Sequence, residues 1–185
     1  MKWLWNDDEV NAKLATENVA NVLVNKLRRL KEKSQYILKI ASCLGASFND
    51  SILNTVVTKL PADSDCDDTS SELSGSIQEI HEEGLWERGV SEDSWQFGHD
   101  KLQAAAFDLI APERRDSLRG EIGGILMKEL GPDNLDENIF SVVSLCNYKS
   151  SYLPAECKEM AKMNLAAGLK VRRLHNLICL FFLLG

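Results

Sequence analysis

LWERGVSEDSWQF, residues 85–97, is the stretch that decides the fold of this chain. Two short runs with aromatic residues, at 85–88 and 94–97, flank the turn-rich link GVSED at 89–93. Aromatic side chains favour strands, whereas glycine, serine and aspartate favour turns. The pattern therefore predicts a β-hairpin made of two short strands.

Three predicted helices precede this hairpin, each with apolar residues three and four positions apart. Ser34 is placed to cap the first helix, and Gly45 is placed to end it as a left-handed C-cap. Asp50 is placed to cap the second helix, and Gly84 ends the third. The order of three helices and a hairpin is typical of a winged helix. The sequence thus predicts a mainly α fold with a winged-helix-like domain at residues 34–98.

The segments on either side of this domain are also predicted to be helical. Residues 1–33 contain an amphipathic helix at 16–30, and residues 99–170 contain several amphipathic helices separated by proline and glycine. Short connections between such helices imply antiparallel helical hairpins, as in a helical-repeat arm. Residues 171–185 form an aberrant apolar tail, and its apolar run, residues 177–184, is too short to span a bilayer, since a span needs about 20 residues. The last predicted helix begins at Pro154 and runs through Met160, Ala161, Leu165 and Gly168.

The composition is that of a globular chain, because 44% of its 185 residues are hydrophobic and 26% are charged. A net charge of −7 argues against a general surface for nucleic acids or anionic membranes. The cysteines are odd in number, without a C-x-x-C pair, and the acidic start lacks a signal peptide. Together these features predict a cytoplasmic protein. The cysteines are Cys43, Cys66, Cys146, Cys157 and Cys179.

No cofactor or metal site is expected within the chain itself. His81, His99 and His175 are far apart in sequence, and no cysteine has a partner within four residues, unlike the ligands of zinc sites. The acidic segment 62–72 lacks the glycine and glutamate spacing of a calcium loop, so we expect a surface loop. The glycines at 120–124 lie inside a helical pattern without the lysine and hydroxyl of a phosphate loop. Close helix packing is the predicted reason for them.

His99 and Asp100 look like a catalytic pair, but we interpret them as structural residues. Asp100 is placed to cap the helix that begins there, and His99 to tie the hairpin to that helix by a hydrogen bond. Neighbouring residues at a strand-to-helix junction point in different directions. A cysteine–histidine pair stays open, since such partners meet only in space. Cys43, on an apolar helix face, is expected to be a poor thiolate.

The helix predicted at 71–83 occupies the place of the recognition helix in a winged helix. It carries glutamates and neither lysine nor arginine. Phosphate contacts supply most non-specific affinity for DNA, and they need cations. DNA binding through this helix is therefore disfavoured, and a DNA-binding transcriptional regulator is kept as an alternative. The glutamates are Glu72, Glu79, Glu82 and Glu83.

Three segments together resemble a known family. They are SQYILKIASCLGASF at 34–48, FGHDKLQAAAFDLI at 97–110 and NLAAGLK at 164–170. Their order and spacing resemble AAA/STAND-type predicted ATPases, the origin-recognition-complex-like regions of large multidomain signalling kinases and cyclases. The resemblance covers about residues 3–170. The residues that carry its last two motifs are Phe97, His99, Asp100, Gln103, Ala105, Ala106, Asn164, Leu165 and Gly168.

The resemblance implies that this chain follows the nucleotide-binding core of such an ATPase. Residues 1–33 are then the end of the ATPase lid or a linker helix, with the winged-helix-like domain and the helical arm, residues 99–170, after it. The family's phosphate loop and Mg²⁺-binding strand are expected before Met1, so ATP and Mg²⁺ are expected only upstream. By itself the chain is not expected to be an enzyme. Its expected partners are other domains of the parent protein or other proteins.

The chain departs from the family in two places. Leu30 is followed by Lys31 where the family has Leu-Pro, and the pattern stops after Lys170. We expect that the apolar tail reflects a truncated or mis-spliced gene model. A further alternative is an accessory subunit whose Arg28 or Arg29 completes the ATP site of a partner.

Overall fold

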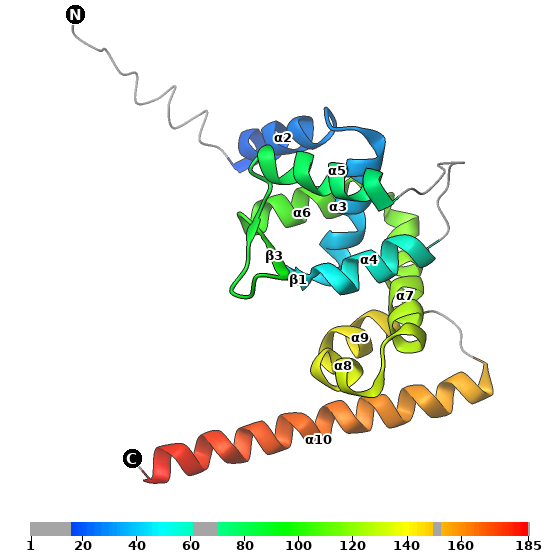
Figure 1. The fold of residues 1–185 in the computed structure, drawn as a ribbon. Helices are drawn as coiled ribbons and strands as arrows, with labels where there is room; N and C mark the ends of the chain where they lie inside the picture. The colour runs from blue at the N-terminus through cyan, green and yellow to red at the C-terminus, as the bar shows by residue number, and fades with distance from the viewer. Residues whose placement is uncertain (1–15, 61–69, 150–152, 185) are drawn as a thin grey trace, which may run out of the picture. The chain divides into compact units, whose positions relative to one another are not determined.

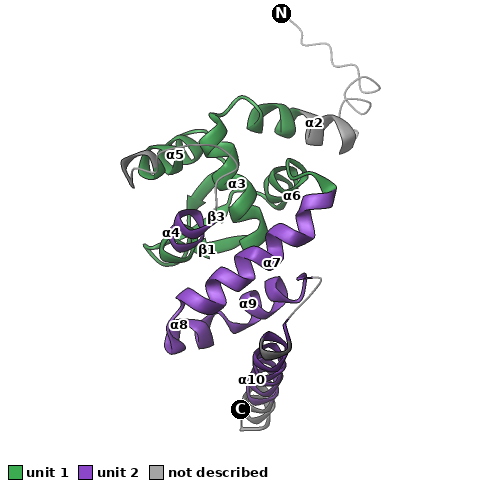
Figure 2. Ribbon diagram, turned by 90° about the vertical axis from the view of Figure 1, so that its right-hand side faces the viewer, with its two compact units in different colours: residues 1–53, 62–112 green, residues 54–61, 113–185 purple. Residues whose placement is uncertain are grey.

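The structure, a computed structural model, is mainly helical with one small antiparallel sheet (Figure 1), which confirms the mainly α fold class. The chain divides into two compact units (Figure 2), a first unit of residues 1–53 and 62–112 and a second unit of residues 54–61 and 113–185. Most of the predicted acidic loop and most side chains of the predicted tail lie outside the described residues. The structure describes residues 16–60, 70–149 and 153–184.

In the first unit, α3 lies at the centre, because it contacts both α5 and α6. α2 also packs against α6, and α4 begins in this unit and continues into the second. Their apolar faces follow from the helical spacing of the sequence. The elements are α2 (Thr16–Leu27), α3 (Glu32–Leu44), β1 (Ser47–Asn49), α4 (Asp50–Lys59), α5 (Ser70–Glu82), β2 (Trp86–Arg88), β3 (Ser94–Phe97) and α6 (Asp100–Asp108).

The predicted hairpin is confirmed, because β2 and β3 pair antiparallel with Trp86 opposite Phe97. The sheet also has a third strand. β1 pairs with β3, places Phe48 opposite Trp95 and gives the strand order β1-β3-β2. The sequence pattern does not predict this strand, because three residues with a single buried side chain are too few for a recognisable alternation.

The sheet carries an aromatic cluster of Phe48, Trp86, Trp95 and Phe97. The ring centroids of Phe48 and Trp86 are 5.0 Å apart, and those of Trp86 and Phe97 are 6.0 Å apart, both in edge-to-face contact. Trp86 is fully buried, and its indole Nε1–H has no hydrogen-bond partner among the described residues. The Trp86 indole is thus held in the cluster by ring packing and not by a hydrogen bond of its Nε1–H.

The ends of α3 and α5 differ in part from the expected ends. Ser34 does not cap α3, because α3 already begins at Glu32 and the buried Ser34 hydroxyl donates a hydrogen bond to Glu79 of α5. Gly45 ends α3 with a φ of 135° but a ψ of −169°, so the predicted left-handed C-cap is wrong. Gly84, with a φ of 65°, follows α5 in the left-handed region, as expected.

Asp50 begins α4, at the position where a cap is expected from the sequence. Its carboxylate accepts a hydrogen bond from the indole Nε1–H of Trp95. Arg88 Nη1 lies 3.6 Å from the same carboxylate, and the Arg88 guanidinium lies 3.9 Å from the centroid of the Trp95 ring. These contacts fasten the start of α4 to the hairpin.

In the second unit, α9 and the last helix, α10, run antiparallel. Asn147, just after α9, lies 3.3 Å from Asn164, whereas Asp136, just before α9, lies 2.8 Å from Lys170 further along α10. The predicted antiparallel arrangement is therefore confirmed for this pair. α8 has six residues and no buried side chain, so it leaves no periodic signal in the sequence. The elements are α7 (Pro112–Glu129), α8 (Pro132–Glu137), α9 (Ile139–Cys146) and α10 (Pro154–Leu184).

The predicted close packing at the glycine cluster is confirmed for two of its glycines. On α7, a Cβ atom at Gly123 would lie 2.6 Å from the backbone nitrogen of Cys146, and one at Gly120 would lie 3.0 Å from the Cα of Lys149. Both glycines therefore let the backbone of α7 touch the end of α9. A Cβ at Gly124 would have no neighbour within 4 Å, so packing does not explain that glycine.

Candidate interaction surfaces

The junction between β3 and α6 contains the first group of predicted motif residues. Phe97 is buried, and its backbone N–H donates to the carbonyl of Ala46 at 2.9 Å. His99 is the N-cap of α6, and its Nδ1 accepts a hydrogen bond from the backbone N–H of Lys101 at 3.0 Å. The prediction that Asp100 is the cap is therefore wrong. His99 has extended backbone angles and sits one residue earlier, which lets its ring reach the open N–H.

His99 also does not tie the hairpin to the helix through its side chain, as the sequence led us to expect. Its ring bonds within the first turn of α6, where it also contacts the carboxylate of Asp100. The two side chains are 60% and 86% exposed. Asp100 accepts a hydrogen bond from Lys101 N–H at 2.8 Å, so both side chains serve the helix end. This geometry agrees with a structural role for the pair.

The rest of this motif joins α6 to α3. Gln103 Nε2–H donates to the carbonyl of Ser42, near the end of α3, at 3.1 Å. Ala105 and Ala106 are buried on the same helix, and their small side chains let α6 approach α3 closely. The motif therefore connects the hairpin, α6 and α3 within the first unit.

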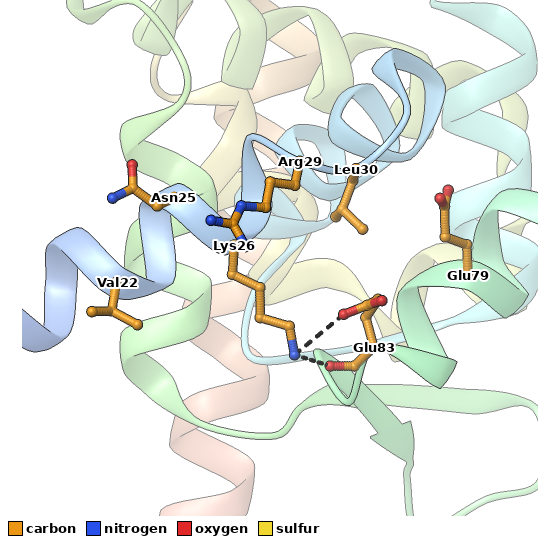
Figure 3. Close-up of a pocket in the computed structure, with 7 residues that line it drawn as sticks. All are labelled: Val22, Asn25, Lys26, Arg29, Leu30, Glu79 and Glu83. Carbon is orange, nitrogen blue, oxygen red and sulfur yellow. Dashed lines mark hydrogen bonds and ion pairs between the residues drawn. The ribbon is translucent and has the colours of Figure 1, made fainter.

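A hollow of about 550 Å³ lies between the end of α2 and α5 (Figure 3). Lys26 crosses it, with Nζ 3.4 Å from the carboxylate of Glu83. Glu79 is held by Ser34 and lies 4.0 Å from Lys31 Nζ. The acidic side of α5 is thus partly occupied by groups of its own unit. The hollow is lined by Val22, Asn25, Lys26, Arg29, Leu30, Glu79 and Glu83.

The two arginines predicted as candidates lie just after α2. Arg28 and Arg29 are both exposed, and Arg29 lines the hollow. Among the described residues, the Arg29 side chain makes no hydrogen bond or ion pair. Arg29 is therefore a cation at the rim of a hollow that also holds two carboxylates.

The second group of motif residues lies on α10. Asn164 Nδ2–H donates to the carbonyl of Met160 at 2.9 Å, and the Asn164 amide also contacts the amide of Asn147. Leu165 is 64% exposed. Gly168 is exposed as well, and a Cβ atom there would have no neighbour within 4 Å. The two groups of motif residues therefore lie in different units.

Of the four residues that the sequence analysis names along α10, Met160 is buried and the other three are exposed. Met160 and Ala167 are buried, and Met163 packs with Ile139 and Val143 of α9. Ala161, Leu165 and Gly168 lie on the exposed side of the same helix. α10 has two rows of apolar residues, and each row fits the helical period. The sequence therefore does not show which side of the helix faces the core. The exposed row is the surface that the sequence reasoning misses.

The described histidine, cysteine and acidic side chains form no cluster that could hold a metal ion. No group of three histidine, cysteine, aspartate or glutamate side chains that could hold a metal occurs within 16–60, 70–149 and 153–184. Burial raises the pKa of the Cys146 thiol to about 11, although Lys149 nearby lowers it. Cys43 is buried and Cys157 exposed. Among the described helices, none is long and apolar enough to cross a membrane.

The Glu156 carboxylate helps to start α10. It accepts hydrogen bonds from the backbone N–H of Leu153 and from the Lys149 ammonium, each at 3.0 Å. The Leu153 bond and then the Lys149 bond lower the pKa of Glu156. The carboxylate thus fastens the first turn of α10 to the end of α9.

Comparison with known proteins gives one partial likeness. No family model matches the chain, and no solved structure matches it. A segment of 60 residues is 35% identical to "Hybrid signal transduction histidine kinase G" of Dictyostelium discoideum. The segment covers 32% of this chain and 2% of the kinase, so the likeness spans a small part of that protein. About a third of this chain is therefore similar to a segment of a signal transduction kinase.

Proposed function

We propose that this chain is a non-catalytic scaffold or regulatory segment of an AAA/STAND-like signalling ATPase, which couples a nucleotide-binding core to partner or effector domains. The observation that carries the proposal is the likeness to a segment of a hybrid signal transduction histidine kinase. Large multidomain signalling kinases are the proteins that the three sequence motifs point to. ATP and Mg²⁺ belong, in this proposal, to a core upstream of the chain, in the cytoplasm.

The topology of the first unit supports the winged-helix part of this proposal. The order α3-β1-α4-α5-β2-β3, with the sheet order β1-β3-β2, is the order of a winged helix. The wing is the hairpin of β2 and β3, whose tip exposes Val90. A winged helix with an acidic third helix suits protein contacts better than DNA, because carboxylates repel phosphate.

The joint at α6 supports a coupling role. His99 fixes the first turn of α6, and Gln103 fixes the helix to α3. A displacement of the hairpin is then passed to α3 as a movement of one packed body, because close-packed interiors transmit strain. In this role the residues of the central motif are positioning residues and do not act on a substrate.

The test is calorimetry of the full chain with Mg²⁺ and ATP. We expect no heat of binding, because the groups that hold phosphate and Mg²⁺ in such ATPases are not among the motifs of this chain. The variant Arg29→Ala is the control for weak binding of ATP at the rim of the hollow. Binding at micromolar ATP in the unchanged chain contradicts the proposal.

A second candidate function rests on Arg29, the exposed cation beside the hollow. An arginine offered to a neighbouring ATP site stabilises the charge that develops in phosphoryl transfer. In this reading the chain is an accessory subunit of an ATPase. Hydrolysis by the parent ATPase core is then expected to rise on mixing with the chain and to fall back with Arg29→Ala. The neighbouring Arg28→Ala is the matched control, and equal loss with both variants contradicts a specific role of Arg29.

A further inference from the structure

α10 presents a second apolar row on the side turned away from α9. Met163 and Ala167 face the core of the second unit. An α-helix turns by about 100° per residue, which places Leu165 and Leu169 on a different side. Their side chains are 64% and 45% exposed. Because they are one turn apart, the two leucines form a continuous exposed row on the helix.

Gly168 lies beside this row, and no packing contact among the described residues requires a glycine there. Gly168 is in the interior of α10, and a Cβ atom there would meet nothing within 4 Å. Glycine inside a helix lowers its stability relative to alanine. Gly120 and Gly123 on α7 are each matched by a touching backbone, whereas Gly168 has no such neighbour among the described residues. Close approach of another backbone is what a helical glycine permits.

The border of the row is basic, although the chain as a whole has a net charge of −7. Lys158, Lys162, Arg172 and Arg173 are exposed along this part of α10. Glu159 is bound to Lys162 at 2.7 Å. No ion pair among the described residues involves the other three cations. The surface thus combines an apolar row with positive charge.

We propose that this α10 face, which consists of Leu165, Gly168 and Leu169 with its basic border, binds an amphipathic helix whose apolar row is bordered by aspartate and glutamate. The inference rests on the proposed scaffold role and names the class of partner. Charge complementarity favours this occupant. A second copy of the face fits poorly, because antiparallel pairing centred on Leu165 sets Lys158 opposite Arg172. A membrane surface also fits poorly, since the row is narrow and contains a glycine.

The experiment measures binding of two synthetic helical peptides to the full chain by fluorescence anisotropy. Both peptides have about five helical turns and the same leucine row, and glutamate borders the row in one and lysine in the other. We expect the glutamate peptide to bind about tenfold or more tightly than the lysine peptide, with an affinity that falls as salt is added.

Variants of the full chain locate the binding. Leu165→Glu is expected to weaken the glutamate peptide about tenfold or more, because it places a like charge in the row. Gly168→Leu is also expected to weaken binding of the glutamate peptide, because the leucine side chain keeps the peptide backbone away from α10. The substitution is expected to leave the fold of the chain intact, because a Cβ atom at Gly168 would meet nothing within 4 Å. Lys158→Glu together with Arg172→Glu is expected to reverse the preference between the peptides. Val90→Glu, at another exposed apolar side chain, is the matched control and is expected to change nothing.

Three results overturn the proposal. The first is equal or absent binding of the two peptides. The second is displacement of the glutamate peptide from the chain by vesicles of phosphatidylcholine and phosphatidylserine, which would make the face a membrane surface. The third is a dimer in sedimentation that Leu165→Glu dissolves. ATP calorimetry is a separate readout, so a chain that binds both ATP and the glutamate peptide contradicts the scaffold role and leaves the α10 face standing.

Discussion

At the scale of single residues, Gly123 fixes the contact between α7 and α9. Its absent side chain leaves room for the backbone nitrogen of Cys146, which would lie 2.6 Å from a Cβ. Gly123→Ala is expected to lower the free energy of unfolding by about 1–3 kcal/mol, because backbone has to move to admit the methyl group. Urea denaturation followed by circular dichroism measures this loss.

The next residue provides the control. A Cβ at Gly124 would meet nothing within 4 Å. Gly124→Ala is expected to raise the free energy of unfolding by about 0.5–1 kcal/mol, because alanine favours the helix over the unfolded chain. If both substitutions change stability by the same amount and sign, the backbone contact at Gly123 is not what makes that glycine necessary.

The Cys146 thiol links stability to alkaline pH. Burial raises its pKa from 9.0 to about 11 in the folded chain. The folded state therefore holds the proton over a range where the unfolded chain has lost it. The resulting stability is complete below pH 9 and is lost as the pH rises to about 11. Cys146→Ala lacks this contribution, so the gap in unfolding free energy between the two chains is expected to narrow across that range in urea titrations. If the difference in unfolding free energy between the two chains stays constant from pH 9 to pH 11, the pKa of Cys146 is not raised by folding.

At the scale of elements, the start of α6 depends on His99. Its ring accepts a hydrogen bond from Lys101 N–H, a backbone donor without a partner inside the helix, and shares this donor with the carboxylate of Asp100. His99→Ala is expected to lower the free energy of unfolding by about 1 kcal/mol, and His99→Asn, which keeps a capping acceptor, is expected to restore most of it. Thermal unfolding of the three chains provides the comparison. Equal losses with alanine and asparagine would mean that the histidine ring acts by packing and not as a cap.

The long periodic elements are the ones that the sequence predicts well. α3, α5, α6 and α7 and the hairpin arise from repeated apolar positions bounded by glycine, proline or turn residues, and each signal is local. β1 and α8 are not predicted, because β1 has one buried residue and α8 has none. β1 and α8 form because other segments of the chain pack or pair with them, and the local sequence pattern carries no information about those segments.

The candidate sites are predicted less completely than the elements. The sequence identifies Gln103, Ala105 and Ala106 as motif positions, but not that Gln103 reaches the carbonyl of Ser42. His99 takes the capping role that the sequence assigns to Asp100, since the choice depends on a difference of one residue in the helix start. The α10 face is missed because its two apolar rows are equivalent in sequence and only the contact with α9 separates them.

At the scale of the whole molecule, the net charge of the chain argues against binding to duplex DNA. A net charge of −7 repels a polyanion, and the carboxylates of Glu79 on α5 and of Glu83, just after α5, are engaged within the first unit. No shift of duplex DNA is expected in gels, even at low salt. A salt-sensitive shift that disappears on substitution within residues 71–83 would support the DNA-binding alternative and contradict this prediction.

The burial of Trp86 has a spectroscopic consequence. Its indole lies among aromatic rings, fully out of contact with solvent, and its Nε1–H has no partner among the described residues. An indole in such surroundings emits at shorter wavelength than one in water. Trp95 lies in the same unit. In a chain with Trp3→Phe and Trp5→Phe, the wavelength of maximum tryptophan emission therefore reports on Trp86 and Trp95 of the first unit. Its fluorescence then serves as a built-in reporter of whether the hairpin and α3 are still joined.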